Sequence, residues 1–384
     1  MTREGRRRGA LRAAWLAFGW FWGSWSALIP EVKRTTGVDD ESLGFLLLAV
    51  PLCALPAMIL SGRAYDRRGG AVLSGGLIAM GGLAPVLGGA GDVLFLAACL
   101  AMLGAASGVV DVALNSATVA ANARSGRNFV QSAQAMFPVA GVVASVVVAA
   151  GRELGAPPWA LLGTATLFLV AAAVSLATTG AAAASAPRPK EGSAPVGQRQ
   201  VLVLLGVTVA LALLVENAVQ QWSSNRMEFE LDAAPGLASL APGVFALCMS
   251  AGRLYAQRTA DATALVPTLR TCALVTGCGL LIAAWAPSPL VALAGFALTG
   301  LGLAPAAPAL FASADRAVPE NVRGRAISMV STIGYSGYFL GPVAVGLSSS
   351  IGGLSAGFTV LAVIALLLLV PTLWLRGPAA GTAP

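Results

Sequence analysis

The chain has 384 residues, of which 57% are hydrophobic and only 11% are charged. A soluble globular protein carries about 25% charged residues. This chain has too few polar residues to cover the surfaces of several soluble domains of ordinary size, so that architecture is excluded. The chain contains no histidine, which excludes a Ser-His-Asp triad and any histidine-ligated metal or haem. We therefore expect an all-α membrane protein that crosses the bilayer many times.

The cysteines also argue against metal chemistry, because they show no CxxC spacing and all lie in apolar runs. They are Cys53, Cys99, Cys248, Cys272 and Cys278. No GxxxxGK[ST] sequence is present, so ATP hydrolysis through such a loop is excluded. We expect neither a metal nor a cofactor.

Charge-free runs predict the membrane spans, since a spanning helix needs about 20 mostly apolar residues. The runs are 13–30, 42–62, 69–91, 93–110, 128–151, 154–187, 200–215, 233–252, 271–314 and 326–375. The last two are long enough for two helices each, with breaks expected at 286–289 and 348–353. Two shorter runs continue past Asp111 and Glu216. This pattern predicts twelve transmembrane helices.

The distribution of charge predicts the orientation. With cytoplasmic termini, all but four of the 24 Lys and Arg residues face the cytoplasm, as the positive-inside rule requires. The exceptions are Lys33, Arg34, Arg152 and Arg226. A cleaved signal peptide is an alternative explanation of the basic start, but its removal would leave eleven spans and spoil the asymmetry. We expect a multi-pass protein of the cytoplasmic membrane, embedded in the lipid bilayer and without a nucleic-acid partner.

The chain divides into two similar halves. Residues 181–198 are rich in Pro, Ala, Gly and Ser and predict a cytoplasmic linker between six-helix bundles at 1–180 and 199–384. Gly62-Arg63-Ala64-Tyr65 recurs as Gly252-Arg253-Leu254-Tyr255, and Trp25-Ser26 recurs as Trp222-Ser223. Parallel repeats of six helices, with a site between them near the midplane, are typical of transporters.

The motif Gly62-x-x-x-Asp66-Arg67-x-Gly69 resembles the loop 2–3 signature of the major facilitator superfamily. The segments 23–30, 111–115 and 334–342 look like those of bacterial permeases related to fucose–proton symporters. Leu28 and Gln134 depart from that pattern, and the first span lacks the acid that fucose symporters carry. The resemblance implies a major facilitator fold, a small-molecule substrate and a monomer, and it matches Asp111 to a protonatable acid.

Two acids inside predicted spans are candidates for proton coupling. Asp111 belongs to a polar stripe on span 4, and a carboxyl at mid-span costs about 2.5–3.5 kcal/mol on insertion scales. Such residues usually mark a transport path. Glu216 lies in span 7 and is the second candidate. The alternatives are a buried structural acid for Asp111 and an outer-vestibule residue for Glu216.

Other polar and aromatic side chains are candidates for the substrate cavity. Amide and hydroxyl groups both donate and accept hydrogen bonds, although interhelical bonding explains any one of them equally well. Trp25 and Trp222 occupy corresponding places in the two halves and could stack on a ring. The predicted cavity residues are Asn115, Gln134, Trp25, Gln220, Trp222 and Tyr335.

The loop signature predicts a cytoplasmic gate. Asp66 and Arg67 lie too far out to touch substrate, and a carboxylate there suits the positive N-terminal end of span 11. The expected gate comprises Gly62, Asp66, Arg67 and Gly69. An ordinary positive loop is the alternative.

These features predict a secondary active transporter of a small organic solute, proton-coupled through Asp111 with Glu216 assisting. Export or broad specificity is favoured because no dense sugar-binding group is visible, and proton-coupled uptake of a sugar-like solute is the alternative. A membrane sensor or an enzyme without transport is the rival of another class. It lacks support, because the loops between spans are too short for an output domain and no histidine is present.

Overall fold

The computed structural model describes residues 2–125, 129–181, 196–259 and 265–374. Within these residues the regular structure is helical, and no strand occurs. The predicted linker at 181–198 falls almost entirely outside them. The helices are α1 (Arg3–Thr36), α2 (Asp40–Arg68), α3 (Gly70–Gly88), α4 (Val93–Ser125), α5 (Phe129–Gln134), α6 (Met136–Glu153), α7 (Pro158–Thr179), α8 (Val196–Glu230), α9 (Pro235–Ser239), α10 (Ala241–Thr259), α11 (Leu265–Ala284), α12 (Pro289–Leu303), α13 (Ala306–Arg316), η1 (Glu320–Val322), α14 (Arg323–Tyr335), α15 (Gly337–Leu366), η2 (Leu367–Leu369) and α16 (Pro371–Trp374).

Among the described residues, ten helical stretches are long and apolar enough to cross a membrane. One of them, Arg323–Trp374, has 52 residues, and its backbone leaves helical geometry at Gly352 and Gly353. This break and the one between α11 and α12 lie where the sequence predicts them. The count of twelve spans stays a prediction.

Helix α1 does not belong to these ten stretches. Its apolar part is rich in tryptophan and also contains serine and glycine, which lowers its mean hydropathy. Nearly all of the segment from Ala14 to Val32 is nevertheless buried against other helices. A helix that is surrounded by protein does not need the aliphatic surface that lipid demands, which explains its composition.

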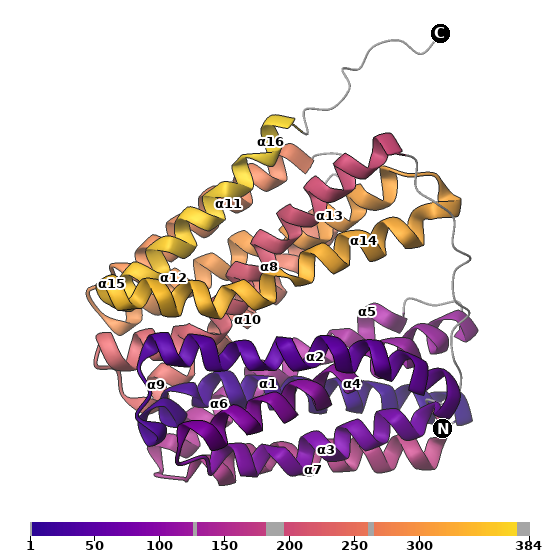
Figure 1. Cartoon of the computed structure of the whole chain (residues 1–384), viewed down its shortest axis with the longest axis horizontal. Helices are drawn as coiled ribbons and strands as arrows, with labels where there is room; N and C mark the ends of the chain where they lie inside the picture. Colours follow the sequence, from indigo (N-terminus) through magenta and orange to yellow (C-terminus); the bar gives the residue numbers. More distant parts are fainter. Residues whose placement is uncertain (1, 126–128, 182–195, 260–264, 375–384) are drawn as a thin grey trace. The chain divides into compact units, whose positions relative to one another are not determined.

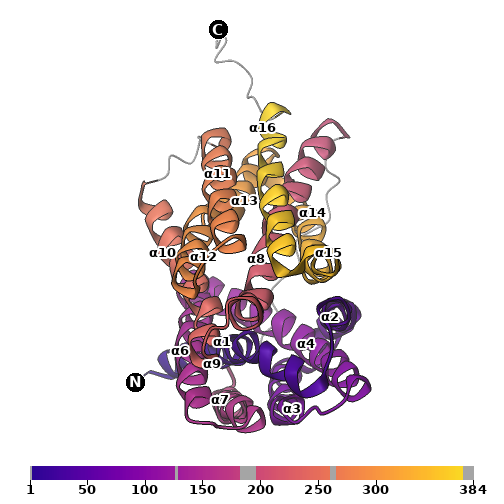
Figure 2. The same ribbon diagram turned by 90° about the vertical axis from the view of Figure 1, so that its left-hand side faces the viewer.

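The chain forms two compact units. The first comprises Met1–Arg188 and Gln220–Leu247, and the second comprises Pro189–Val219 and Cys248–Pro384. In the first unit, α1 packs against α6 and α7, α2 packs against α4, and α3 packs against α4 and α7 (Figures 1 and 2). The continuous helix α8 thus begins in one unit and ends in the other.

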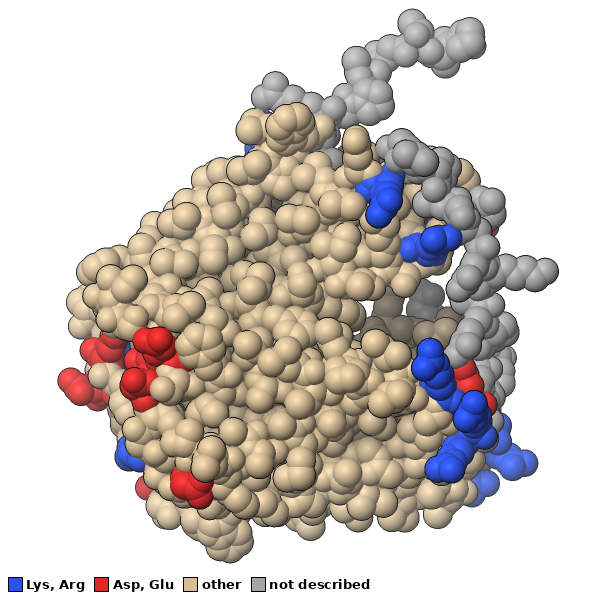
Figure 3. Space-filling view, in the orientation of Figure 1, with Lys and Arg blue, Asp and Glu red and all other residues tan. Residues whose placement is uncertain are grey.

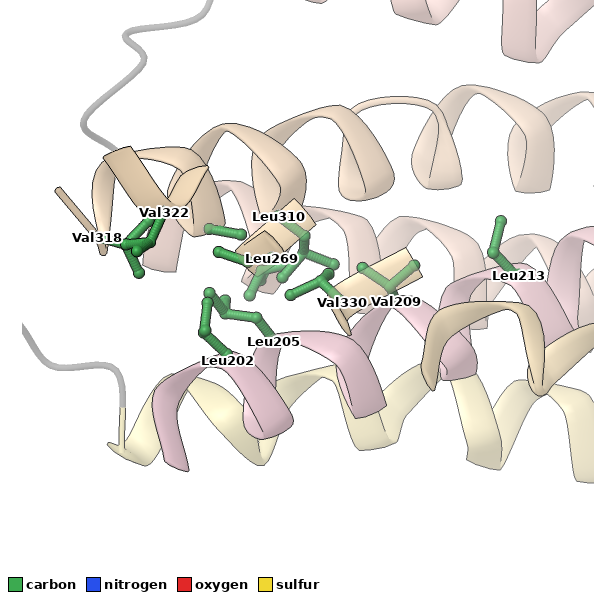
Figure 4. Close-up of a cluster of buried hydrophobic side chains, with 11 residues drawn as sticks. Leu202, Leu205, Val209, Leu213, Leu269, Leu310, Val318, Val322 and Val330 are labelled. Carbon is green, nitrogen blue, oxygen red and sulfur yellow. The ribbon is translucent and has the colours of Figure 1, made fainter. Parts of the chain in front are cut away.

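In the second unit, α11 packs against α12 and α15, and α13 packs against α14. One end of this unit has a cluster of fully buried aliphatic side chains (Figure 4). Leu202 and Leu205 from α8 meet Leu269 from α11, Leu310 from α13 and Val330 from α14. These contacts join helices that are distant in sequence.

Glycines allow the closest helix contacts of the first unit. A Cβ atom at Gly104 of α4 would lie 2.2 Å from the carbonyl oxygen of Val50 on α2, and one at Gly108 would lie 2.5 Å from that of Ala54. A Cβ atom at Gly19 of α1 would lie 2.1 Å from the carbonyl oxygen of Phe137 on α6. The small residues at 104–108 therefore allow the backbones of α4 and α2 to approach closely.

Charge is separated along the helices of the first unit. Helix α2 begins with Asp40 and Glu41 and ends with Arg67 and Arg68. In the view of Figure 3, acidic side chains of this unit gather at one end and most of its visible Lys and Arg side chains at the other. The face between these two ends is uncharged, as a membrane-spanning surface must be.

Candidate functional site

Three of the predicted site residues form one hydrogen-bonded network in the first unit. Asp111 and Asn115 lie one turn apart on α4, and Gln134 is the last residue of α5. The Asn115 amide Nδ2 donates to Asp111 Oδ1 at 3.1 Å and to the Asp111 carbonyl at 2.9 Å. Gln134 Nε2 donates to Asn115 Oδ1 at 2.9 Å. All three side chains are half-buried.

Two further residues of the predicted polar stripe on α4, Thr118 and Asn122, have a structural role. Thr118 Oγ1 accepts a 3.0 Å hydrogen bond from the indole of Trp15 on α1. Asn122 Oδ1 accepts a 2.7 Å bond from the backbone N–H of Phe129 at the start of α5. These contacts hold α4 against its neighbours, whereas Asp111 and Asn115 of the stripe bond to each other and, through Asn115, to Gln134 of α5.

A charged pair occupies the second unit. Arg253 Nη2 of α10 donates to Glu216 Oε2 of α8 at 3.0 Å. Glu216 lies near the middle of α8, which continues to Glu230. Arg253 is one of the cations that the charge distribution assigns to the cytoplasm, so the sequence pattern does not reveal this partner. The repeat of Gly62-Arg63 as Gly252-Arg253 is the one signal that sets the residue apart.

Prolines break helices beside two of the predicted site residues, because a proline has no N–H to donate to the carbonyl four residues before it. Pro138 accounts for the break between α5 and α6 directly after Gln134. Pro342 deprives the Tyr338 carbonyl of its helical donor, and Asn217 Nδ2 of α8 supplies a replacement at 2.9 Å. Tyr335 ends α14 beside this second break, with its ring 6.0 Å from that of Tyr338.

The two predicted cavity tryptophans are enclosed by protein in this structure. Trp25 is 1% exposed and Trp222 is 0% exposed. Their indole N–H groups have no hydrogen-bond partner among the described residues. The segment of α8 that carries Trp222 touches α1, since Ser224 Oγ donates to the Ser26 carbonyl at 3.3 Å. Gln220 is half-buried at the start of that segment.

The predicted gate motif forms the turn between α2 and α3. Gly62 lies in α2, whereas Asp66 and Arg67 are exposed in its last turn. Gly69 has φ 53° and ψ −127°, a conformation that residues with a side chain avoid. Its N–H donates to the Tyr65 carbonyl at 2.7 Å, and α3 begins at the next residue. The role of this motif as a gate stays a prediction.

A second polar centre, which the sequence analysis does not predict, surrounds Arg152 at the end of α6. Its Nη1 and Nη2 atoms donate to the two carboxylate oxygens of Glu228 at 2.8 and 3.0 Å. Nη2 also donates to Glu31 at 2.9 Å, and Nη1 reaches the Pro235 carbonyl and Ser239 Oγ, each at 3.1 Å. The side chains of Arg152 and Glu228 are 3% and 6% exposed.

Each of the four cations that break the positive-inside pattern has an acidic partner. Lys33 pairs with Asp40, and Arg34 pairs with Glu31 and Glu228. Arg226 pairs with Glu230 at 2.7 Å, and Arg152 pairs with Glu228 and Glu31. The sequence therefore contains a signal for this centre. These four cations are the exceptions to the positive-inside rule, and acidic residues lie close to them in the sequence or the fold.

Comparisons with known proteins support the helical fold and point to a family. Residues 205–384 match the family model of the Major Facilitator Superfamily. An uncharacterized MFS-type transporter of Yersinia pestis is 29% identical, over 92% of each chain. The membrane protein MosC of Rhizobium meliloti is 26% identical, over 84% of this chain and 79% of MosC.

Solved structures show the same fold at low sequence identity. The nucleoside transporter NupG superposes with a TM-score of 0.73 and 12% identity, over 98% of this chain and 100% of that one. A bacterial homologue of the human lysosomal transporter Spinster gives a TM-score of 0.73 and 13% identity, over 97% and 95% of the two chains. The C-terminal half of the chain thus resembles the major facilitator superfamily, and transporters are similar to nearly the whole chain. This likeness supports an integral multi-pass membrane protein of transporter type rather than an enzyme, with a small molecule as its substrate.

Proposed function

We propose that this protein is a proton-coupled secondary transporter that moves a small organic solute across the cytoplasmic membrane by alternating access. It works as a monomer with twelve spans in two bundles and with both termini in the cytoplasm. Support for the orientation comes from the first unit, where α1 and α2 have their basic ends on one side. At the opposite ends of these helices lie acidic residues, and the cations there form ion pairs with them.

The observation that carries proton coupling is the environment of Asp111. Within the described part of the chain it forms no ion pair, and its side-chain partner is the neutral amide of Asn115. A carboxyl group inside a span without a cation is costly while charged, so the binding of a proton changes its energy strongly. Glu216 differs, because Arg253 neutralises it at 3.0 Å. Asp111 is therefore the primary proton site, and Glu216 assists.

The network around Asp111 supplies a way to sense that proton. The amides of Gln134 and Asn115 both donate toward the carboxylate in series. A protonated carboxyl group keeps an acceptor oxygen and gains an O–H donor, so protonation of Asp111 adds to this network a donor that needs an acceptor. Gln134 ends α5 at the break before α6, where a rearrangement can be passed to the backbone. The resemblance to fucose–proton symporters, which matches Asp111 to a protonatable acid, supports the same role.

For the solute, we propose a chemical class rather than a single compound. Trp25 and Trp222 together with the abundant aliphatic surface support export of an amphipathic metabolite or broad specificity. Asn115, Gln134, Gln220 and Tyr335 support the alternative, proton-coupled uptake of a sugar-like solute. Both classes require the same proton step at Asp111.

Transport by Asp111→Asn tests the proposal. A thermal screen of sugars, nucleosides, amino acids and amphipathic compounds first identifies a solute that stabilises the purified protein. That solute is then added outside proteoliposomes that contain the protein. We expect the variant to lose accumulation driven by a pH gradient, down to the level of protein-free liposomes, while solute exchange at equal pH continues. Asp92→Asn is the matched control, because Asp92 caps the start of the same helix through a 2.8 Å bond from the Phe95 N–H, and asparagine caps equally well. Gradient-driven accumulation at the wild-type rate in Asp111→Asn would exclude the role.

A further inference from the structure

Arg253 is an arginine of a membrane-spanning helix whose hydrogen-bonding capacity is only partly used. A guanidinium group presents five N–H donors in a planar fork, and a carboxylate that faces it squarely accepts two parallel bonds. Glu216 accepts one bond, from Nη2 at 3.0 Å. The Nε atom of Arg253 is buried and has no partner among the described residues. The fork therefore has donors left for a second acceptor.

Arg152 shows what a fully satisfied arginine looks like in the same molecule. Both of its Nη atoms bond to Glu228 in the bidentate arrangement, and further acceptors surround them. Its side chain is 3% exposed, whereas that of Arg253 is 36% exposed and that of Glu216 is 18% exposed. This exposure gives water or a ligand access to the donors that Glu216 leaves free. The geometry of Arg253 is that of a binding group rather than of a structural bridge.

We propose that Arg253 binds the carboxylate of an organic anion, and that Glu216 occupies its place while the site is empty. This inference rests on the proposed function, since it names the substrate class of a transporter. A proton taken from solution converts Glu216 to the neutral acid and ends its attraction for the guanidinium. The substrate carboxylate then accepts the two N–H bonds of the fork. When the anion leaves, Glu216 returns the proton to solution and pairs with Arg253 again.

The charge balance of this step suits a carrier inside a membrane. One proton and one negative charge enter together, so the site has the same net charge when it is loaded and when it is empty. The tyrosine pair at the break before α15 packs against the helix that carries Glu216, because Asn217 of α8 bonds to the Tyr338 carbonyl. Tyr335, 45% exposed, offers an aromatic face for the apolar part of such an anion. The inferred substrate is therefore an amphipathic organic anion.

Benzoate and benzamide form a matched pair of probes, because they share a shape and differ in charge. A ligand that binds the folded state raises apparent stability according to its concentration and Kd. We expect benzoate to raise the melting temperature of the full-length protein in detergent, and benzamide to have no comparable effect. In Glu216→Gln the benzoate Kd should fall by about tenfold, because a competing charge-assisted hydrogen bond is lost. Arg253→Gln should abolish the benzoate shift.

Two further variants make the result decisive. Arg270→Gln removes an exposed cation of the same unit and should leave the benzoate shift at the wild-type value. The double variant Glu216→Gln with Arg253→Gln keeps a neutral hydrogen-bonding pair, so it should fold and show no benzoate shift. An equal shift with benzamide, a benzoate shift retained in Arg253→Gln, or none in Glu216→Gln would overturn the proposal.

The experiment separates this inference from proton coupling at Asp111. Asp111→Asn lies in the other compact unit and should bind benzoate as the wild type does. If the charge dependence at Arg253 holds while proton-driven transport of every solute is absent, the proposed function fails and the anion site stands. If transport through Asp111 holds while benzoate and benzamide behave alike, the anion site fails alone.

Discussion

At the scale of single residues, the Arg152 centre is the most heavily bonded polar group of the first unit. Its guanidinium joins α6 to Glu228 of α8, to Glu31 of α1 and to the carbonyl of Pro235 in α9. Ser239 strengthens the same point, since its hydroxyl also bonds to the Ala27 carbonyl at 3.1 Å. Buried charges of this kind are stable only while every partner is present.

Arg152→Gln should therefore lower stability strongly. Removal of one partner from a buried ion pair costs about 3–5 kcal/mol, because the remaining charges stay buried without compensation. We expect a clear drop in the apparent melting temperature in detergent. The double variant with Glu228→Gln should be less destabilised than Arg152→Gln alone.

The matched control is Arg323→Gln. Arg323 forms a 3.8 Å ion pair with Asp315 in which both side chains are 45% exposed, and such pairs contribute about 0–1 kcal/mol. If Arg152→Gln were as mild as Arg323→Gln, the Arg152 centre would have no structural importance.

At the scale of elements, glycine and proline determine how the helices meet and where they bend. The glycines of α1 and α4 bring backbones into direct contact with α6 and α2. Pro138 and Pro342 place breaks beside Gln134 and Tyr335. The glycines make the contacts between paired helices tight, whereas the prolines leave backbone carbonyl groups without helical donors beside the candidate site residues.

Gly104→Ala should destabilise the α2–α4 contact. The new methyl group would lie 2.2 Å from the Val50 carbonyl oxygen and 2.8 Å from its Cα atom, so the backbones must separate. Overpacking of this kind costs about 1–3 kcal/mol, and thermal unfolding in detergent would measure it.

Gly82→Ala is the control for helix propensity. Gly82 of α3 has nothing within 4 Å of the position where its Cβ would be, so alanine should be neutral or stabilising by up to about 1 kcal/mol. Equal effects of the two substitutions would contradict the close-packing argument.

At the scale of the whole molecule, the segment 220–247 belongs by sequence to the second half and by contact to the first. The Arg152 centre and the Ser224 bond to the Ser26 carbonyl attach it to α1 and α6. Trp25, Trp222 and Asn225 are buried there with side-chain donors that have no partner among the described residues. Unsatisfied buried groups are costly, and an alternating-access cycle would give them water or solute as partners when this contact opens.

Cysteine labelling at Ser223 tests whether the Arg152 centre keeps this contact closed. Ser223 is 0% exposed, so Ser223→Cys should react slowly with a membrane-impermeant maleimide in a chain whose native cysteines are replaced by alanine. Addition of Arg152→Gln should increase the labelling rate several-fold. Ser42→Cys, at an exposed position, should be labelled rapidly in both backgrounds. An unchanged rate at position 223 would show that the Arg152 centre does not control access.

The sequence by itself determined what depends on local composition and short spacing. Apolar runs and proline pairs predicted the helices and their breaks, and a spacing of one helical turn placed Asp111 beside Asn115. Glu216 was visible as an acid inside a span. Its partner Arg253 was not, because 37 residues separate them and a basic residue near the end of a span is ordinary.

Only the tertiary structure decided which charges meet. Arg152 and Glu228 are 76 residues apart, and no periodicity relates them. It also decided that residues 220–247 pack with the N-terminal helices across the predicted boundary at 181–198. The physical reason is that the sequence pattern reports the environment of each helix, apolar or polar, whereas the identity of the neighbour depends on how the helices pack.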